Sequence, residues 1–96
     1  MARLSDSEID DRLRASAWTR DGDAIVRDVE CKGFHSAMAL VNAVADAANE
    51  ANHHPDMLVH GYKHVRLTLS THSDGGITES DLGLAGTIDG LVADAS

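Results

Sequence analysis

Three histidines and one aspartate are the residues of this sequence best suited to proton transfer. His53 and His54 are adjacent, His72 follows eighteen residues after the second of them, and Asp81 comes nine residues later. Imidazole gains and loses a proton near neutral pH, so two or three imidazoles around one pocket could act as general acid and general base. A carboxylate beside them could orient an imidazole or stabilise its protonated form.

A metal site is the main alternative for the same residues, because imidazole is a common ligand of zinc and copper. Metal-binding histidines on a helix are typically four residues apart, whereas adjacent helical residues point about 100° away from each other. His53 and His54 lack the helical metal-binding spacing. We therefore expect proton transfer rather than a bound metal ion.

Several of these residues also have a purely structural interpretation. Asp81 lies three residues after Thr78, a spacing typical of a capping box at a helix start, although the same carboxylate could still face a pocket. We interpret His60 and His64 as surface residues. Trp18 is the only tryptophan, and it could anchor the core or an interface, or form a flat wall for a planar ligand.

The histidines fall at the ends of predicted secondary-structure elements. Apolar residues recur every three or four positions over residues 34–53, which predicts a long helix that Pro55 terminates. His53 and His54 would lie at its carboxyl end, where the helix dipole favours a protonated imidazole. Residues 63–72 alternate between apolar and polar, which predicts a strand with His72 on the polar face at its far end. A sheet packed against the helix could bring these two ends together.

The remaining patterns predict an α+β fold. Ser5 and Glu8 have capping-box spacing at the start of a short first helix. Residues 15–30 read as a hairpin with an Asp-Gly turn, residues 57–62 as a short strand, and Thr78 as the N-cap of a last helix. The order helix, two strands, helix, two strands, helix predicts a four-stranded antiparallel sheet with three helices packed on one face.

Length and composition limit the possible functions. The chain has 96 residues and one cysteine, with 16 acidic and 8 basic residues for a net charge of −8. The length predicts a single domain, residues 1–96, that would gain stability from self-association. The acidic excess argues against nucleic-acid and membrane partners, since no surplus of cations neutralises phosphates. The lone Cys31 and the lack of a signal-peptide pattern predict a cytoplasmic protein.

The residues also point to a known family by resemblance. The segment "NHHPD", the aromatic Tyr62, the segment "LTLSTH" and Asp81 resemble the signature of the pterin-4a-carbinolamine dehydratases, and the similarity extends from about Leu4 to Val92. The resemblance implies dehydration of 4a-hydroxytetrahydropterin to quinonoid dihydropterin, in the recycling of tetrahydrobiopterin after aromatic amino-acid hydroxylation. It also implies a homodimer or homotetramer, a small-molecule pterin as substrate, and no metal or organic cofactor.

Carried over by position, the resemblance assigns roles to particular residues. It makes His53, His54 and His72 the catalytic histidines, has Pro55 shape the pocket, and has Asp81 support His72. Dehydration must protonate the hydroxyl at C4a and remove a proton from N5, which one acidic and one basic imidazole could do together.

The chain departs from the family at two positions. Asn49 stands where an acidic or other ionisable residue is common, although its amide could still hydrogen-bond the pterin. Met57 stands where an aromatic is common, which would alter the pocket lining or the packing between subunits. Two other functions stay open: a protein-binding or dimerisation module, like relatives that are partners of transcription factors, and pterin handling linked to molybdopterin metabolism.

Overall fold

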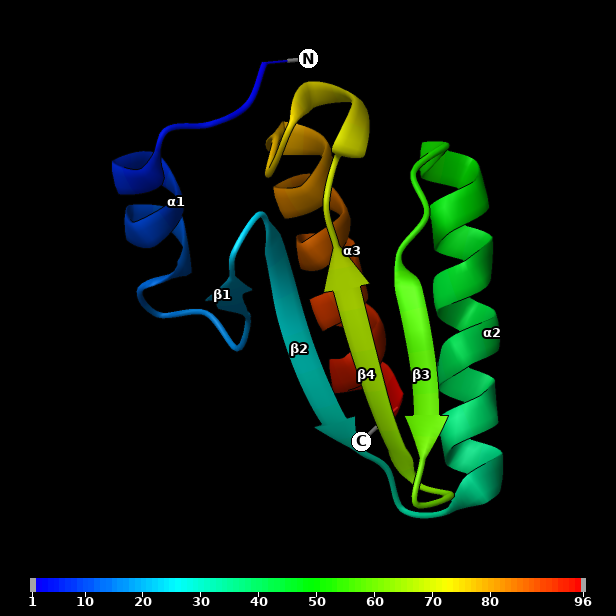
Figure 1. The fold of residues 1–96 in the computed structure, drawn as a ribbon. Helices are drawn as coiled ribbons and strands as arrows, with labels where there is room; N and C mark the ends of the chain where they lie inside the picture. Colours follow the sequence, from blue (N-terminus) through cyan, green and yellow to red (C-terminus); the bar gives the residue numbers. More distant parts are fainter. Residues whose placement is uncertain (1, 96) are drawn as a thin grey trace.

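A computed structural model describes residues 2–95 as helices on one side of an antiparallel sheet (Figure 1). The helices are α1 (Asp6–Leu13), α2 (Phe34–Ala51) and α3 (Glu79–Ala95), with a short 3₁₀ turn η1 (His72–Asp74). The strands are β1 (Thr19–Asp21), β2 (Ala24–Glu30), β3 (Asp56–His60) and β4 (His64–Leu69). This element order confirms the predicted α+β fold. Within the described residues no helix has the length and apolar character that crossing a membrane would require.

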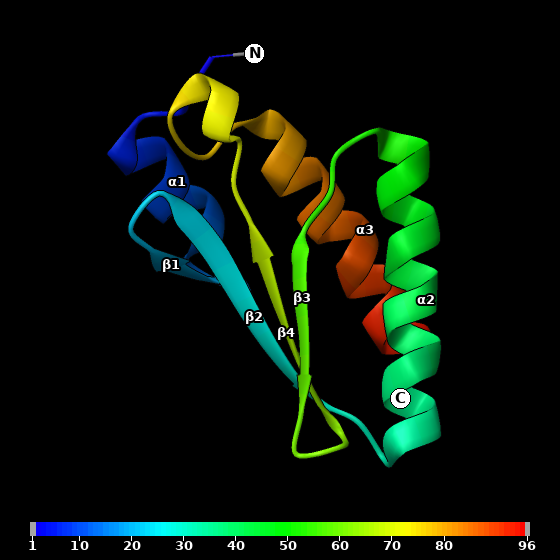
Figure 2. The same cartoon turned by 45° about the vertical axis from the view of Figure 1, so that its right-hand side comes forward.

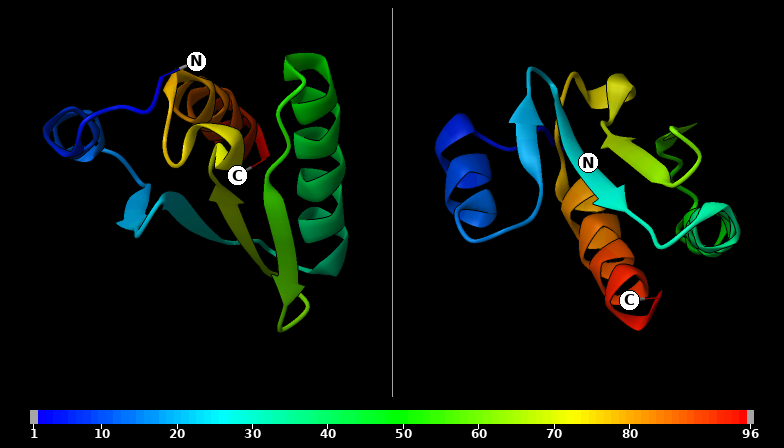
Figure 3. Two further views of the ribbon diagram at one scale, coloured as in Figure 1. Left: turned by 45° about the horizontal axis from the view of Figure 1, so that its top comes forward. Right: turned by 90° about the horizontal axis from the view of Figure 1, so that it is seen from below.

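The strands pair in the order β1-β2-β4-β3, and every neighbouring pair is antiparallel. Leu67 in the inner strand β4 faces Arg27 of β2 on one side and Met57 of β3 on the other. Figure 2 shows α2 and α3 on one side of the strands. In the views of Figure 3, α1 lies beyond β1 at one edge of the sheet and α2 lies beyond β3 at the other.

One apolar core fills the space between sheet and helices. The predicted alternation in β4 is confirmed, because Val65, Leu67 and Leu69 are all buried and face the helices. The buried apolar residues are Ile9, Trp18, Ile25, Ala37, Leu40, Val44, Ala48, Val65, Leu67, Leu69, Ile77, Leu84, Ala85 and Ile88. All three helices and the two inner strands, β2 and β4, therefore contribute to the same core.

Trp18 anchors this core and does not form a ligand wall. Its side chain is 2% exposed, and its indole Nε1 donates a hydrogen bond to Oδ1 of Asp89 on α3 at 2.8 Å. Arg27 of β2 donates to the same carboxylate oxygen. Because the indole faces are covered by protein, the second interpretation offered by the sequence, a flat wall for a planar ligand, is wrong.

The carboxyl end of α2 differs from the prediction. The helix ends at Ala51, because Asn52 adopts a left-handed conformation with φ of 52°. The backbone N–H groups of Asn52 and His53 both reach back to the carbonyl of Ala48, which completes the cap. Asparagine tolerates this conformation better than most residues. Asn52 and not Pro55 therefore terminates the helix, and the histidine pair lies beyond it.

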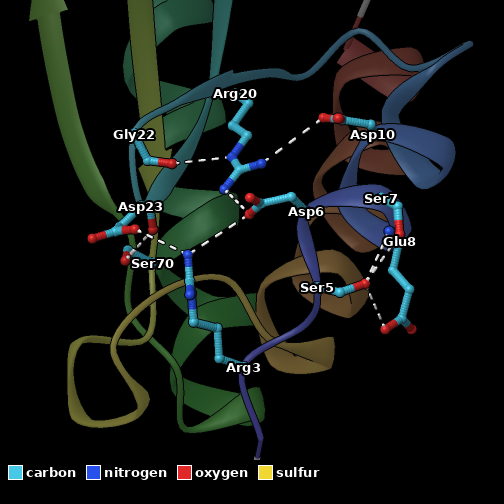
Figure 4. A network of polar contacts seen from close by, with 10 residues as sticks. All are labelled: Arg3, Ser5, Asp6, Ser7, Glu8, Asp10, Arg20, Gly22, Asp23 and Ser70. Atoms are coloured by element: carbon cyan, nitrogen blue, oxygen red, sulfur yellow. Dashed lines mark hydrogen bonds and ion pairs between the residues drawn. The ribbon is translucent and has the colours of Figure 1, made fainter.

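Polar contacts join the N-terminal segment and α1 to the β1–β2 hairpin. Figure 4 shows Arg20 of β1 donating to Asp6 of α1 at 2.7 Å and to the carbonyl of Gly22 at 3.1 Å. Arg3 lies 3.6 Å from the carboxylate of Asp23 in the β1–β2 turn. Gly22 has φ of +60°, which the turn requires. These contacts fasten the first helix to the hairpin, although β1 is shorter than the predicted strand.

Both predicted helix starts are capped by their own side chains, each with one of the two bonds of a capping box. Oγ of Ser5 accepts from the backbone N–H of Glu8 at 3.3 Å and donates to its carboxylate at 3.0 Å. At the start of α3, the backbone N–H of Thr78 donates to Asp81 at 2.9 Å, and Oγ1 of Thr78 accepts from the N–H of Ser80 at 3.2 Å. Local sequence therefore defines where these two helices begin.

Candidate active site

A shallow pocket of about 190 Å³ opens where β3 begins and β4 ends. We call it the histidine pocket, because His54 and His72 both line it. The complete lining is Asp23, Ala24, His54, Asp56, Thr68, Ser70 and His72. Two imidazoles from segments far apart in sequence thus meet at one surface, as the sequence predicted.

The β3–β4 hairpin brings these residues together. Asp56 pairs with Thr68 in the antiparallel ladder, so the start of β3 lies beside the end of β4. The hairpin turn needs Gly61, whose φ is +54° and where a Cβ would lie 3.1 Å from the ring of His64. His72 lies past the end of β4, as the first residue of η1. It is therefore held by a turn and not by the strand in which it was predicted.

His54 is oriented by Asn49 in the last turn of α2. Nε2 of His54 lies 3.0 Å from the amide oxygen of Asn49. An amide oxygen only accepts, so Nε2 carries the proton in this contact and Nδ1 is left as the acceptor of a neutral ring. In a neutral His54 ring, the contact with Asn49 therefore leaves Nδ1 as the nitrogen that could accept a proton.

His53 does not share the histidine pocket. It lines a separate cavity of about 420 Å³ between α2 and α3, together with residues such as Glu50 and Glu79. Burial alternates from His53 through β3, as in a strand whose successive side chains point to opposite sides. Adjacent residues beyond the helix end therefore diverge. The expectation that three imidazoles border one pocket holds for His54 and His72 and is wrong for His53.

Asp81 contacts His53, whereas the resemblance had implied that it would support His72. Its carboxylate is fully buried, and Oδ1 lies 2.5 Å from Nε2 of His53. Oδ2 accepts from Oγ1 of Thr71 at 2.8 Å and from the backbone N–H of Thr78. Burying a carboxylate is costly unless it is paired and hydrogen-bonded. These three donors meet that requirement, and the link from Asp81 to His72 runs through the neighbouring Thr71.

The other lining residues were only partly visible in the sequence. The alternation in residues 63–72 placed Thr68, Ser70 and His72 on one polar face, and all three line the pocket. Asp23 arrives from the β1–β2 turn, and nothing in the local sequence signals this. Its carbonyl accepts a hydrogen bond from Ser70 at 2.7 Å, which holds the turn against the end of β4 (Figure 4).

Pro55 lies next to the pocket lining without belonging to it. It is partly buried and stands between His54 and Asp56, both of which line the pocket, without being part of the lining itself. Its ring fixes the backbone φ close to −65°.

Within residues 2–95 there is no cluster of three or more histidine, cysteine, aspartate or glutamate side chains that could hold a metal ion.

Fold and pocket together define a small α+β protein with a pocket lined by two histidines at one end of its sheet. The chain matches the family model described as pterin 4 alpha carbinolamine dehydratase over residues 2–91. A protein of Thermomicrobium roseum assigned to this family by its name is 51% identical over 86 residues, covering 88% of this chain and 91% of the relative. A Nocardia farcinica protein with the same assignment is 48% identical over 89 residues, 92% of this chain and 93% of its own length. The chain belongs to the pterin-4-alpha-carbinolamine dehydratase family.

Solved structures agree with this placement. The crystal structure of a transcriptional coactivator/pterin dehydratase from Brucella melitensis superposes with a TM-score of 0.87 at 33% identity, covering 94% of this chain and 98% of that one. A pterin dehydratase-like protein described as a RuBisCO assembly factor of the alpha-carboxysome has a TM-score of 0.63 at 20% identity, over 78% of this chain and 86% of its own. The second likeness concerns the fold alone.

Proposed function

We propose that this protein dehydrates a 4a-hydroxytetrahydropterin to quinonoid dihydropterin, in the reactions that restore tetrahydrobiopterin after aromatic amino-acid hydroxylation. The observation that carries the proposal is the shared pocket of His54 and His72. Family membership supports the same reaction. The reaction needs one proton donor and one proton acceptor close together, and the two imidazoles can supply both.

The two proton transfers are complementary. The hydroxyl on C4a takes a proton from the acid and leaves as water, while the base removes the proton from N5 and the C4a–N5 double bond forms. We assign the base to His54, whose Nδ1 is the acceptor when Asn49 fixes the proton on Nε2. His72 is then the acid. General acid–base catalysis of this kind contributes roughly a hundred- to ten-thousandfold.

The remaining predicted site residues take supporting roles in this proposal. Asn49 orients His54 and does not need to touch the pterin. Pro55 fixes the backbone between two pocket residues. His53 and Asp81 hold the histidine-bearing segments in place from behind the pocket, so His53 is a positioning residue and not a catalytic one.

The decisive test measures quinonoid dihydropterin formation from freshly generated 4a-hydroxytetrahydropterin by stopped flow. Wild-type protein should exceed the rate in buffer, and His54→Ala and His72→Ala should each lose at least about a hundredfold of kcat. His35→Ala removes an exposed histidine from the first turn of α2, away from the pocket, and serves as the matched control. A folded wild-type protein with no rate above buffer would overturn the proposal.

We further propose that the protein forms a homodimer or homotetramer. Apolar side chains are exposed on neighbouring elements: Phe34 is 54% and Met38 36% exposed on α2, and Leu58 is 55% exposed on the edge strand β3. Large apolar side chains exposed on neighbouring elements are typical of an interface, and a second copy of the chain would cover them. Analytical ultracentrifugation of wild type and Phe34→Lys tests this, because the variant should shift to a smaller species and a wholly monomeric wild type would contradict it.

A further inference from the structure

Asp56 is a second type of functional group in the histidine pocket. It is the first residue of β3, and it lines the pocket with His54 two positions earlier in the chain. Burial alternates from His53 through β3, so His54 and Asp56 lie on the same side of this extended segment. A bicyclic ring lying against this side could contact His54 at one edge and Asp56 at another. Asp56 therefore lies where the half of the ring away from a proton acceptor at His54 would reach.

The Asp56 carboxylate has no partner within the described part of the chain. No hydrogen bond or ion pair joins it to another described residue. By contrast, the carboxylates of Asp23, Asp28 and Glu79 each pair with an arginine. The other pocket carboxylate, Asp23, lies 3.6 Å from the guanidinium of Arg3. Among the two pocket acids, Asp56 is thus the one whose oxygens are free to accept hydrogen bonds from a ligand.

The pterin ring offers a matching pair of donors. Its 2-amino group and the adjacent N3–H project side by side, on the pyrimidine half of the ring and away from the N5 and C4a atoms that react. An ionised carboxylate accepts two parallel N–H bonds in this bidentate manner, and such charge-assisted bonds are among the stronger ones in proteins. Resting on the proposed function, we infer that Asp56 determines specificity by binding the 2-amino and N3–H edge of the pterin.

This inference separates recognition from proton transfer. Asp56 binds the half of the ring that does not react, and His54 and His72 act on the other half. Rings that lack the 2-amino donor leave one carboxylate oxygen unpaired and should bind more weakly, because a site built to hydrogen-bond a group discriminates against ligands without it.

The test is equilibrium binding of two unreactive rings, 7,8-dihydropterin and 7,8-dihydrolumazine, which differ by a 2-amino against a 2-oxo group. Wild type should favour dihydropterin. Asp56→Asn should weaken dihydropterin binding by at least about tenfold and erase most of the preference, since it removes the charge and one acceptor. Asp46→Asn is the matched control, because it removes the same charge from an exposed position on α2 and should stay within about twofold of wild type.

The outcomes separate this inference from the proposed function. Unchanged dihydropterin binding in Asp56→Asn, or an equal loss for both rings, would overturn the inference even if the protein is an active dehydratase. A wild type that prefers dihydropterin through Asp56 yet fails to accelerate dehydration would support the inference and defeat the proposed reaction. Circular dichroism of each variant confirms that the exposed substitutions leave the fold intact.

Discussion

Nε2 of His53 lies 2.5 Å from Oδ1 of Asp81, a carboxylate with no exposed surface, twenty-eight residues away in the chain. The other oxygen of Asp81 accepts from Thr71 at the end of β4 and from the backbone of Thr78 before α3. One buried carboxylate therefore joins three segments. Since His54 follows His53 and His72 follows Thr71, the same carboxylate connects the two segments that carry the pocket imidazoles.

The donor directions in this network follow from its chemistry. Asp81 only accepts while it is ionised, so the hydroxyl of Thr71 must donate to it at 2.8 Å. The Thr78 hydroxyl, 2.9 Å from that of Thr71, must then be the donor between the two. The N–H of Ser80 in turn donates to Thr78. Every hydroxyl has one defined role, which gives the turn around His72 a single arrangement.

Asp81→Asn should destabilise the protein strongly. The amide cannot accept from all three donors, and disrupting a buried charge network typically costs about 3 to 5 kcal/mol. Urea unfolding of the variant and of wild type measures the change in the free energy of unfolding. The exposed Asp46→Asn control should remain within about 0.5 kcal/mol of wild type. Equal free energies of unfolding for Asp81→Asn and wild type would show that the carboxylate does not stabilise the fold.

Thr71→Val should lower kcat more than it raises KM. The substitution keeps the side-chain volume but removes the hydroxyl that connects Asp81 to the His72 turn, and a small misplacement of a catalytic group can cost up to about a hundredfold. We expect a loss of about tenfold or more, with most activity regained in Thr71→Ser. Thr87→Val removes an exposed hydroxyl from α3 as the control. If Thr71→Ser is as slow as Thr71→Val, the hydroxyl is not the group that matters.

Arg12 should control the titration of Glu79. The guanidinium of Arg12 binds the carboxylate at 2.7 and 3.2 Å, and this hydrogen bond, together with the charge of Arg12, holds the pKa of the Glu79 carboxyl below its ordinary value. A lowered folded-state pKa contributes stability above the unfolded pKa, which is lost as the pH falls through the folded pKa. Carboxyl NMR titration should show the Glu79 pKa returning toward its ordinary value in Arg12→Gln.

Added salt and a control variant test the Glu79 prediction further. Salt should reduce the effect, because both side chains are about half exposed and such pairs are screened. Arg14→Gln breaks the pair with Asp11 on α1, and it should leave the Glu79 titration unchanged. A Glu79 titration curve that is identical in wild type and Arg12→Gln would contradict the assignment.

Asn52 should tolerate glycine and resist alanine. Its left-handed backbone ends α2 immediately before the histidine pair, and a non-glycine residue without a short polar side chain pays roughly 1 kcal/mol or more in this conformation. Asn52→Ala should lower the free energy of unfolding by about that amount, while Asn52→Gly should be nearly neutral. Asn42→Ala, at an exposed position inside α2, should be neutral or stabilising. Thermal unfolding of the three variants makes the comparison, and a more stable Asn52→Ala would refute it.

Patterns within single segments determined most of the fold before any tertiary information. The apolar alternation in β4, the helical repeat of α2 and the capped starts of α1 and α3 each report interactions among residues a few positions apart, so they can be read from sequence. The pocket shared by His54 and His72 was also predictable, because an antiparallel hairpin necessarily places the start of one strand beside the end of the next.

Only the tertiary structure decided which partner each functional side chain meets. Asn52 ended the helix before the histidine pair, and the extended segment after it placed His53 and His54 on opposite sides. The pairing of His53 with Asp81, the arrival of Asp23 from another turn and the burial of Trp18 against Asp89 all join segments distant in the chain. Such contacts depend on how whole elements pack, and packing is a property of the assembled core that no local pattern records.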